Sequence, residues 1–150
     1  MINCRFRRGL TGLIVLVVLL VGGGCSQQAQ ARDDLVHALA EAHSALGSTS
    51  LALDLLAESR ITRAAAETAV DDMSQQIGDA QHQLEPIRVD SDAQQADRDA
   101  AVRAVAAGFE ALLLTRDQLR QGQSTTDARS ALAQADQEVA ALSTRLQAGG

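Results

Sequence analysis

Apolar residues recur in this chain at alternating intervals of four and three residues. This is the spacing of an α-helix that buries one face. The longest run covers residues 66–87 and keeps the intervals 4, 3, 4, 3, 4, 3 through Ala66, Val70, Met73, Ile77, Ala80, Leu84 and Ile87. Such a run forms the seam between packed helices, and several of its places are held by alanine. We find no alternating β pattern of useful length, so the chain is predicted to be all-α.

Three short segments rich in Gly, Ser, Thr or Pro interrupt the helical pattern, at residues 47–50, 86–91 and 122–126. The predicted helices therefore cover residues 28–46, 50–85, 91–121 and 126–148. Gly47 is expected to end the first helix, because a helix C-cap favours a residue that tolerates positive φ. Ser91 and Gln94 have the spacing of a capping box, which predicts the start of the third helix.

Each of the other predicted helices carries its own apolar stripe. In the first, the stripe is Leu35, Leu39, Ala42 and Leu46. In the third, it is Val102, Val105, Phe109, Leu112 and Leu119, with Arg116 as an interruption. In the fourth, it is Ala128, Leu132, Ala135, Val139, Leu142 and Leu146. Four amphipathic helices with short loops predict an antiparallel up-down helical bundle, with a helical hairpin array or a long coiled coil as the alternative.

The second predicted helix is much longer than the first. At about 1.5 Å per residue, residues 50–85 would span roughly 54 Å and residues 28–46 about 28 Å. The two middle helices would then overhang the others as a two-helix arm. The alternative is a break near residues 59–62, where the seam passes through polar Ser59 and Arg63. We expect Arg63 and Arg116 to lay their stems on apolar surface and keep their charged heads in water.

The first 25 residues have the organisation of a secretory signal. Arg5, Arg7 and Arg8 form a positively charged start, an apolar run follows from Leu10 to Val21, and small residues precede Cys25. A membrane-spanning helix needs about 20 apolar residues, and the stretch up to Gly24 is shorter than that. Three consecutive glycines also favour an end to the helix before the cysteine. Cleavage is therefore expected rather than a membrane span.

The run Gly22-Gly23-Gly24-Cys25 resembles the lipobox of bacterial lipoproteins. The resemblance implies a diacylglyceryl group on the Cys25 thiol, cleavage between Gly24 and Cys25, and often an acyl chain such as palmitate on the new amino terminus. Gly22 departs from the common form of the motif, which has leucine there. Two acyl chains suffice for stable anchoring, whereas one does not. The alternatives are ordinary cleavage that leaves Cys25 a free thiol, and an uncleaved anchor.

Removal of residues 1–24 would change the charge of the chain. All 19 acidic residues lie beyond Cys25, and ten of the 13 basic residues remain, which gives a net charge of −9. This balance argues against nucleic acid as a partner, because nucleic-acid binding depends on clustered basic residues. The aromatic content is also low, with Phe109 the only aromatic residue after Cys25. A deep aromatic-lined ligand pocket is therefore less expected than in an average domain.

The histidines offer the only candidate pattern for metal or acid–base chemistry. Asp34 and His37, like Asp79 and His82, have the (i, i+3) spacing of bundle di-iron sites. Both histidines fall about 200° from the apolar stripes, so they are expected on the surface. Asp33, His37 and Glu41 form a line that reads as a solvated face, and His43 has no evident partner. We therefore expect no metal site, no cofactor and no catalytic residue, and predict that the protein is not an enzyme.

The organisation expected from the sequence is a cleaved signal peptide at residues 1–24, a lipidated tether at 25–27 and a helical bundle domain at 28–148. The expected location is the extracytoplasmic face of the cell membrane, reached through the lipid on Cys25. The expected function is binding to an envelope protein partner or self-association. The alternative is a carrier of a small apolar ligand or lipid within the bundle.

Overall fold

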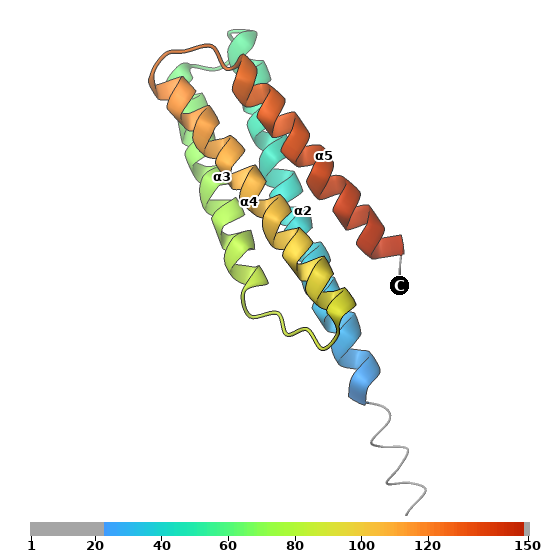
Figure 1. Ribbon diagram of the computed structural model, residues 1–150. Coiled ribbons are helices and arrows are strands. Elements are labelled where there is room, and N and C mark those ends of the chain that lie inside the picture. The colour runs from blue at the N-terminus through green and yellow to red at the C-terminus, as the bar shows by residue number, and fades with distance from the viewer. Residues whose placement is uncertain (1–22, 149–150) are drawn as a thin grey trace, which may run out of the picture.

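The computed structural model describes the backbone of residues 23–148 and the side chains of residues 28–148. Four helices make up this part of the chain: α2 (Gly23–Ala57), α3 (Arg63–Leu84), α4 (Asp92–Arg120) and α5 (Thr126–Ala148). They run alternately up and down, with α2 and α4 each packed between α3 and α5 (Figure 1). The predicted antiparallel four-helix bundle is confirmed. Of the expected signal peptide at residues 1–24, residues 1–22 lie outside the described residues.

The predicted end of the first helix at Gly47 is wrong, because α2 continues through residues 47–50 to Ala57. The apolar stripe continues as well: after Leu46, its next positions are Thr49, Leu53 and Leu56, again at intervals of 3, 4 and 3. Thr49 and Leu53 are buried, and Leu56 packs against the core. The Thr49 hydroxyl donates to the carbonyl of Ala45 at 2.9 Å, so burial leaves this polar group satisfied. Core packing therefore outweighs the weak helix propensity of this segment.

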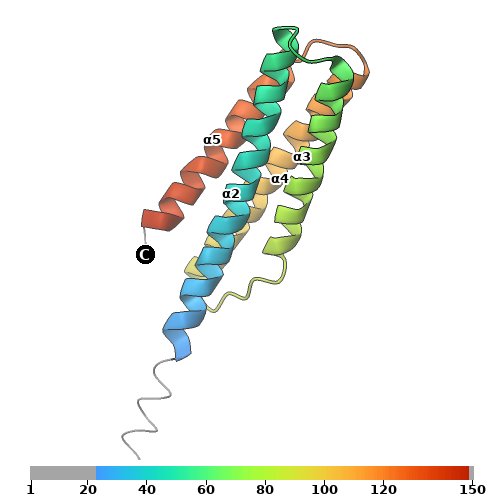
Figure 2. The same cartoon turned by 180° about the vertical axis from the view of Figure 1, so that it is seen from behind.

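Helix α2 ends eleven residues later than predicted, at a reversal built on Ser59. Ser59 has a φ of 58°, and its amide donates to the Leu56 carbonyl while the Arg60 amide donates to the Leu55 carbonyl at 2.8 Å. These are the two bonds of a Schellman motif. Thr62 then caps α3 by accepting from the Ala65 amide at 3.2 Å. The expected alternative of a break near residues 59–62 is confirmed, and the helices lie alongside one another without a two-helix arm in this part of the chain (Figure 2).

The buried face of α4 differs from the predicted stripe. Its buried positions at intervals of 4, 3, 4, 3 and 4 are Ala101, Val105, Gly108, Leu112, Thr115 and Leu119. Val102 is exposed, Phe109 is only partly buried, and Arg116 lies off the seam. Gly108 explains the difference, since a Cβ at this position would lie 2.8 Å from Ile77 Cδ1. The glycine allows α4 to approach α3 closely, and this turns the smaller residues of α4 inward.

The stripes of α3 and α5 agree with the sequence analysis. In α3 every position of the seam is buried except Met73, which packs against the core while partly exposed. In α5 all six predicted positions are buried, and the helix has the predicted bounds. At the start of α4, Ser91 Oγ accepts from the Gln94 amide as predicted, but Gln94 Oε1 accepts from the amide of Asp90 at 2.8 Å, so only the N-cap bond of the predicted capping box forms. Strong periodicity and a capping motif were thus sufficient signals here.

The position of Gly47 in the middle of α2 leads to a stability prediction. Gly47 is exposed within α2, with open space where a Cβ would stand, so Gly47→Ala should raise the free energy of unfolding by about 0.5–1 kcal/mol. Gly122 has a φ of +68° just beyond α4, so Gly122→Ala should lower it by about 1 kcal/mol. Urea unfolding of both variants measures the two changes. A destabilising Gly47→Ala substitution would contradict a continuous α2.

The amino-terminal end of the bundle as a candidate functional site

The amino-terminal end of α2 is where the sequence places its one recognisable motif. The backbone of Gly23, Gly24 and Cys25 lies within α2, so the expected tether at residues 25–27 and the two residues that precede it are helical. The side chain of Cys25 lies outside the described residues. None of the helices from Gly23 to Ala148 is long and apolar enough to cross a membrane.

Helix α2 extends past the rest of the bundle at this end. The side chains of Ala31 and Leu35 share one cavity with Leu146, which lies close to the end of α5. Residues of α2 that precede Gln28 therefore lie beyond the last turn of α5, and the projecting end of α2 is visible in both ribbon views (Figures 1 and 2). An attachment at Cys25 would thus be separated from the bundle only by about two turns of helix.

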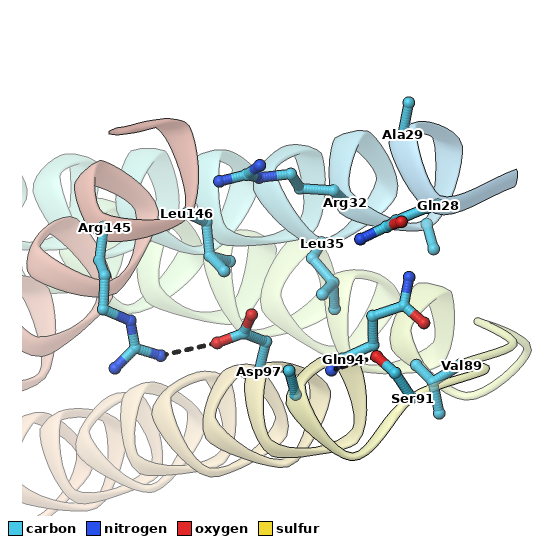
Figure 3. A pocket seen from close by; sticks show the side chains of 12 residues that line it. Gln28, Ala29, Arg32, Leu35, Val89, Ser91, Gln94, Asp97, Arg145 and Leu146 are labelled. Carbon is cyan, nitrogen blue, oxygen red and sulfur yellow. Dashed lines mark hydrogen bonds and ion pairs between the residues drawn. The ribbon is translucent and has the colours of Figure 1, made fainter. Parts of the chain in front are cut away.

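The cavity at this end has a volume of about 630 Å³, within the range of about 300–1,000 Å³ usual for small-molecule sites. It lies between the first turns of α2, the linker before α4, the start of α4 and the last turns of α5. Its apolar wall is formed by Ala29, Ala31, Leu35, Val89, Ala93 and Leu146. Its polar wall is formed by Gln28, Arg32, Ser91, Gln94, Asp97 and Arg145. Figure 3 shows Leu35 and Leu146 directed into the space between the helices.

Two arginines line the cavity, and only one of them forms an ion pair among the described residues. Arg145 of α5 donates to Asp97 of α4 at 3.0 Å, which joins the two helices across one side of the cavity (Figure 3). Arg32 of α2 is half-buried, and among the described residues no acidic side chain lies within ion-pairing distance of it. The side chain extends over the cavity towards α5. The cavity therefore combines an apolar wall with one uncompensated positive charge.

The linker that closes the cavity is held by Arg98. Its Nε donates to the carbonyl of Leu84 at 3.2 Å, and its Nη2 donates to the carbonyl of Glu85 at 3.1 Å. These are carbonyls at the end of α3, which the helix itself cannot satisfy. At the opposite end of the same helix pair, Arg63 Nη1 donates to the Leu119 carbonyl at 2.8 Å. Arginines from α3 and α4 thus donate to carbonyls at each other's carboxyl ends, and Arg63 remains exposed.

The predicted metal-type patterns are dispersed over the surface. His37 pairs with Glu41 at 3.3 Å and His82 with Glu85 at 3.6 Å, and both imidazoles are exposed as expected. His43, for which the sequence suggested no partner, contacts Asp136 of α5 at 2.5 Å. Within residues 28–148 the structure brings no three His, Cys, Asp or Glu side chains into a metal-binding group.

A groove between α4 and α5 is a second hollowed surface of the bundle. It consists of two adjoining hollows of about 280 and 550 Å³, which share Glu138. Its floor is largely alanine, contributed by Ala100, Ala104, Ala107, Ala111, Ala131, Ala135 and Ala141. Leu114, with 40% of its surface exposed, stands at one end, and Arg103 and Arg145 stand at the other. The sequence showed the alanines but gave no sign that they would leave a groove.

Comparisons of the chain with protein-family models, with curated proteins and with solved structures found no match. The functional proposals below therefore depend on the sequence motif and on the geometry of these two surfaces.

The capping arginines lead to a second stability prediction. Helix α4 ends in a Schellman motif at Gly122, whereas Glu85 at the end of α3 has a right-handed conformation with φ of −62°. Loss of Arg98 therefore leaves the carbonyls at the end of α3 with fewer hydrogen-bond donors than loss of Arg63 leaves to the Leu119 carbonyl, which also accepts from the Gly122 amide. We expect Arg98→Met to lower the free energy of unfolding by about 1.5 kcal/mol and Arg63→Met by about 0.5 kcal/mol. Equal losses in urea titrations of the two variants would show that the arginines do not act as caps.

Proposed function

We propose that this protein is a lipid-anchored, non-catalytic lipoprotein of the bacterial cell envelope. The observation that carries the proposal is the run Gly22-Gly23-Gly24-Cys25 after a basic and apolar segment. The net charge of −9 beyond the cleavage site opposes adsorption of the bundle to an anionic bilayer, so the acyl chains on Cys25 would supply the attachment. The bundle would then stand on the extracytoplasmic face of the membrane.

Attachment at Cys25 would fix how the bundle stands. Because α2 is helical from Gly23 onward, the lipid would join a helix rather than a flexible tether. The end of the bundle with the cavity and the linker at residues 85–91 would face the membrane. The loops at residues 58–62 and 121–125 would lie at the far end, away from the lipid.

We further propose that the protein acts by protein contacts made through the α4–α5 groove, with a second copy of the chain as the occupant. Copies anchored in one membrane stand parallel, so a two-fold axis would run along the bundle and bring the groove of each copy onto the other. Residues at the same height along the two copies would then lie opposite each other. Arg103 of α4 and Glu138 of α5 line the same hollow and form no ion pair with each other. Each could pair with the opposite residue of the second copy.

The charge pattern of the groove gives this proposal a direct test. In the full chain in phospholipid vesicles, energy transfer between dyes at the carboxyl ends of two copies should report self-association. Arg103→Glu and Glu138→Arg should each weaken the dimer about tenfold, because each places like charges opposite one another in both symmetric pairs. The double variant should restore association.

Arg60→Glu is the matched control, because Arg60 is an exposed arginine in the loop at the far end of the bundle. It should leave the energy transfer unchanged. If the double variant stays as weak as the single variants, the proposed pairing is wrong. If no variant changes the signal, or if the natural chain shows none while a different protein cross-links to the groove, the second copy is not the occupant.

The lipid anchor is tested by the intact mass of the protein extracted from membranes. We expect a chain that begins at Cys25 and carries a diacylglyceryl group, with or without an amide-linked acyl chain. Cys25→Ala should abolish both the lipid and the cleavage. Cys4→Ala, which removes the other cysteine, should leave the mature mass unchanged because Cys4 lies in the expected signal peptide. A lipid-free chain that begins elsewhere would contradict the proposal.

A second candidate function is the binding of a small apolar ligand or lipid, and the end cavity is the observation that favours it. The middle of the bundle is closed by fully buried side chains such as Leu39, Leu46 and Leu112. A ligand would have to displace this core to enter it, whereas the end cavity is already formed. Native mass spectrometry of the membrane-extracted protein should then show a retained small-molecule adduct.

A further inference from the structure

The end cavity is lined by both apolar and charged side chains. Leu35 of α2 and Leu146 of α5 both point from their helices towards the start of α4 (Figure 3), and each has only 3% of its surface exposed. Val89 of the linker closes the same wall. Arg32 lies one turn before Leu35 on α2, lines the same cavity, and extends towards the last turns of α5. A ligand would therefore meet hydrocarbon inside the cavity and a guanidinium group beside it.

The charge of the cavity contrasts with that of the whole chain. Residues beyond Cys25 carry 19 acidic and ten basic side chains, but the cavity is lined by two arginines and a single acidic residue. Asp97, the acidic one, is engaged by Arg145 at 3.0 Å. Arg32 is left without an acidic partner among the described residues. The guanidinium of an arginine without an acidic partner favours an anionic group that accepts two parallel hydrogen bonds, as a carboxylate does.

We infer that this cavity binds a single-chain anionic amphiphile of the fatty-acid class. The carboxylate lies on the Arg32 guanidinium, and the hydrocarbon chain lies between Leu35, Leu146 and Val89. The amide groups of Gln28 and Gln94 are the additional polar groups beside the charged head. This inference rests on the second candidate function, ligand binding, and does not depend on lipidation of Cys25.

A photoreactive fatty acid in phospholipid vesicles that contain the full chain tests the inference. The probe is a twelve-carbon acid with a diazirine in its chain, and unlabelled dodecanoate is the competitor. Mapping of the cross-links by mass spectrometry should find them on peptides that contain Leu35, Val89 or Leu146, and dodecanoate should remove them. The methyl ester of the probe, which lacks the charge, should label these peptides about tenfold less.

Variants separate the roles of charge and space. Arg32→Gln should weaken the competable labelling about tenfold, while Arg60→Gln, which removes an equal charge at the far end of the bundle, should not change it. Ala93 lines the cavity and is exposed, so Ala93→Leu narrows the cavity without adding bulk to the core and should abolish the labelling. Circular dichroism of both cavity variants checks that the helices remain formed. Cys25→Ala should retain the labelling.

Three results would overturn the inference. The first is labelling that dodecanoate does not remove or that lies outside the cavity peptides. The second is an equal loss in Arg32→Gln and Arg60→Gln. The third is full labelling of Ala93→Leu. If labelling fails while native mass spectrometry still shows an adduct, the protein binds a ligand of another class; if both fail, the ligand-binding function itself is wrong.

Discussion

The continuous apolar stripe of α2 is the feature on which the rest of the structure depends. It passes without a break from Leu35 to Leu56 and includes the buried Thr49, whose hydroxyl is satisfied by the Ala45 carbonyl. This continuity lets α2 run the full length of the bundle, so that α3, α4 and α5 all find a partner surface along their own lengths. Had α2 stopped at Gly47, the surplus residues would have joined the next helix and produced an overhang. The extra length of α2 appears instead at its amino-terminal end.

The polar contacts between helices then fix how the four helices align. Arg129 of α5 pairs with Asp54 of α2, and Arg120 of α4 pairs with Asp71 of α3 at 3.0 Å. Exposed pairs of this kind each add less than about 1 kcal/mol, so they select an alignment more than they stabilise it. The arginine caps on α3 and α4 act at the same helix pair. The cavity lies at the end of the bundle where α2 extends past α5.

The sequence was informative wherever one helix alone determined the outcome. The bounds and buried face of α5, the seam of α3 and the N-cap at Ser91 all follow from local spacing. The predictions failed where contacts between helices determine which residues are buried. The local composition of residues 47–50 indicated a loop, but these residues are helical and Thr49 is buried in the core. The unbroken spacing of the apolar stripe through Thr49 was the signal that could have predicted this. In α4, whether Phe109 or Gly108 faces the core depends on how closely Ile77 of α3 approaches. The apolar stripe of one helix carries no information about that distance. The cavity was equally invisible to the sequence, because it depends on the relative lengths of helices that are distant in the chain.

Amide hydrogen exchange at residues 47–53 of the full chain tests the central claim most directly. In a continuous α2, the amides of Ser50 to Leu53 are bonded within a helix packed on the core, so they should exchange as slowly as those of Leu39 to Leu46. The amides of the loop at residues 121–125 provide the reference for rapid exchange. Protection equal to that of residues 39–46 is the predicted result. Exchange at residues 47–53 as fast as in that loop would mean that α2 ends near Gly47 and that the bundle is assembled differently.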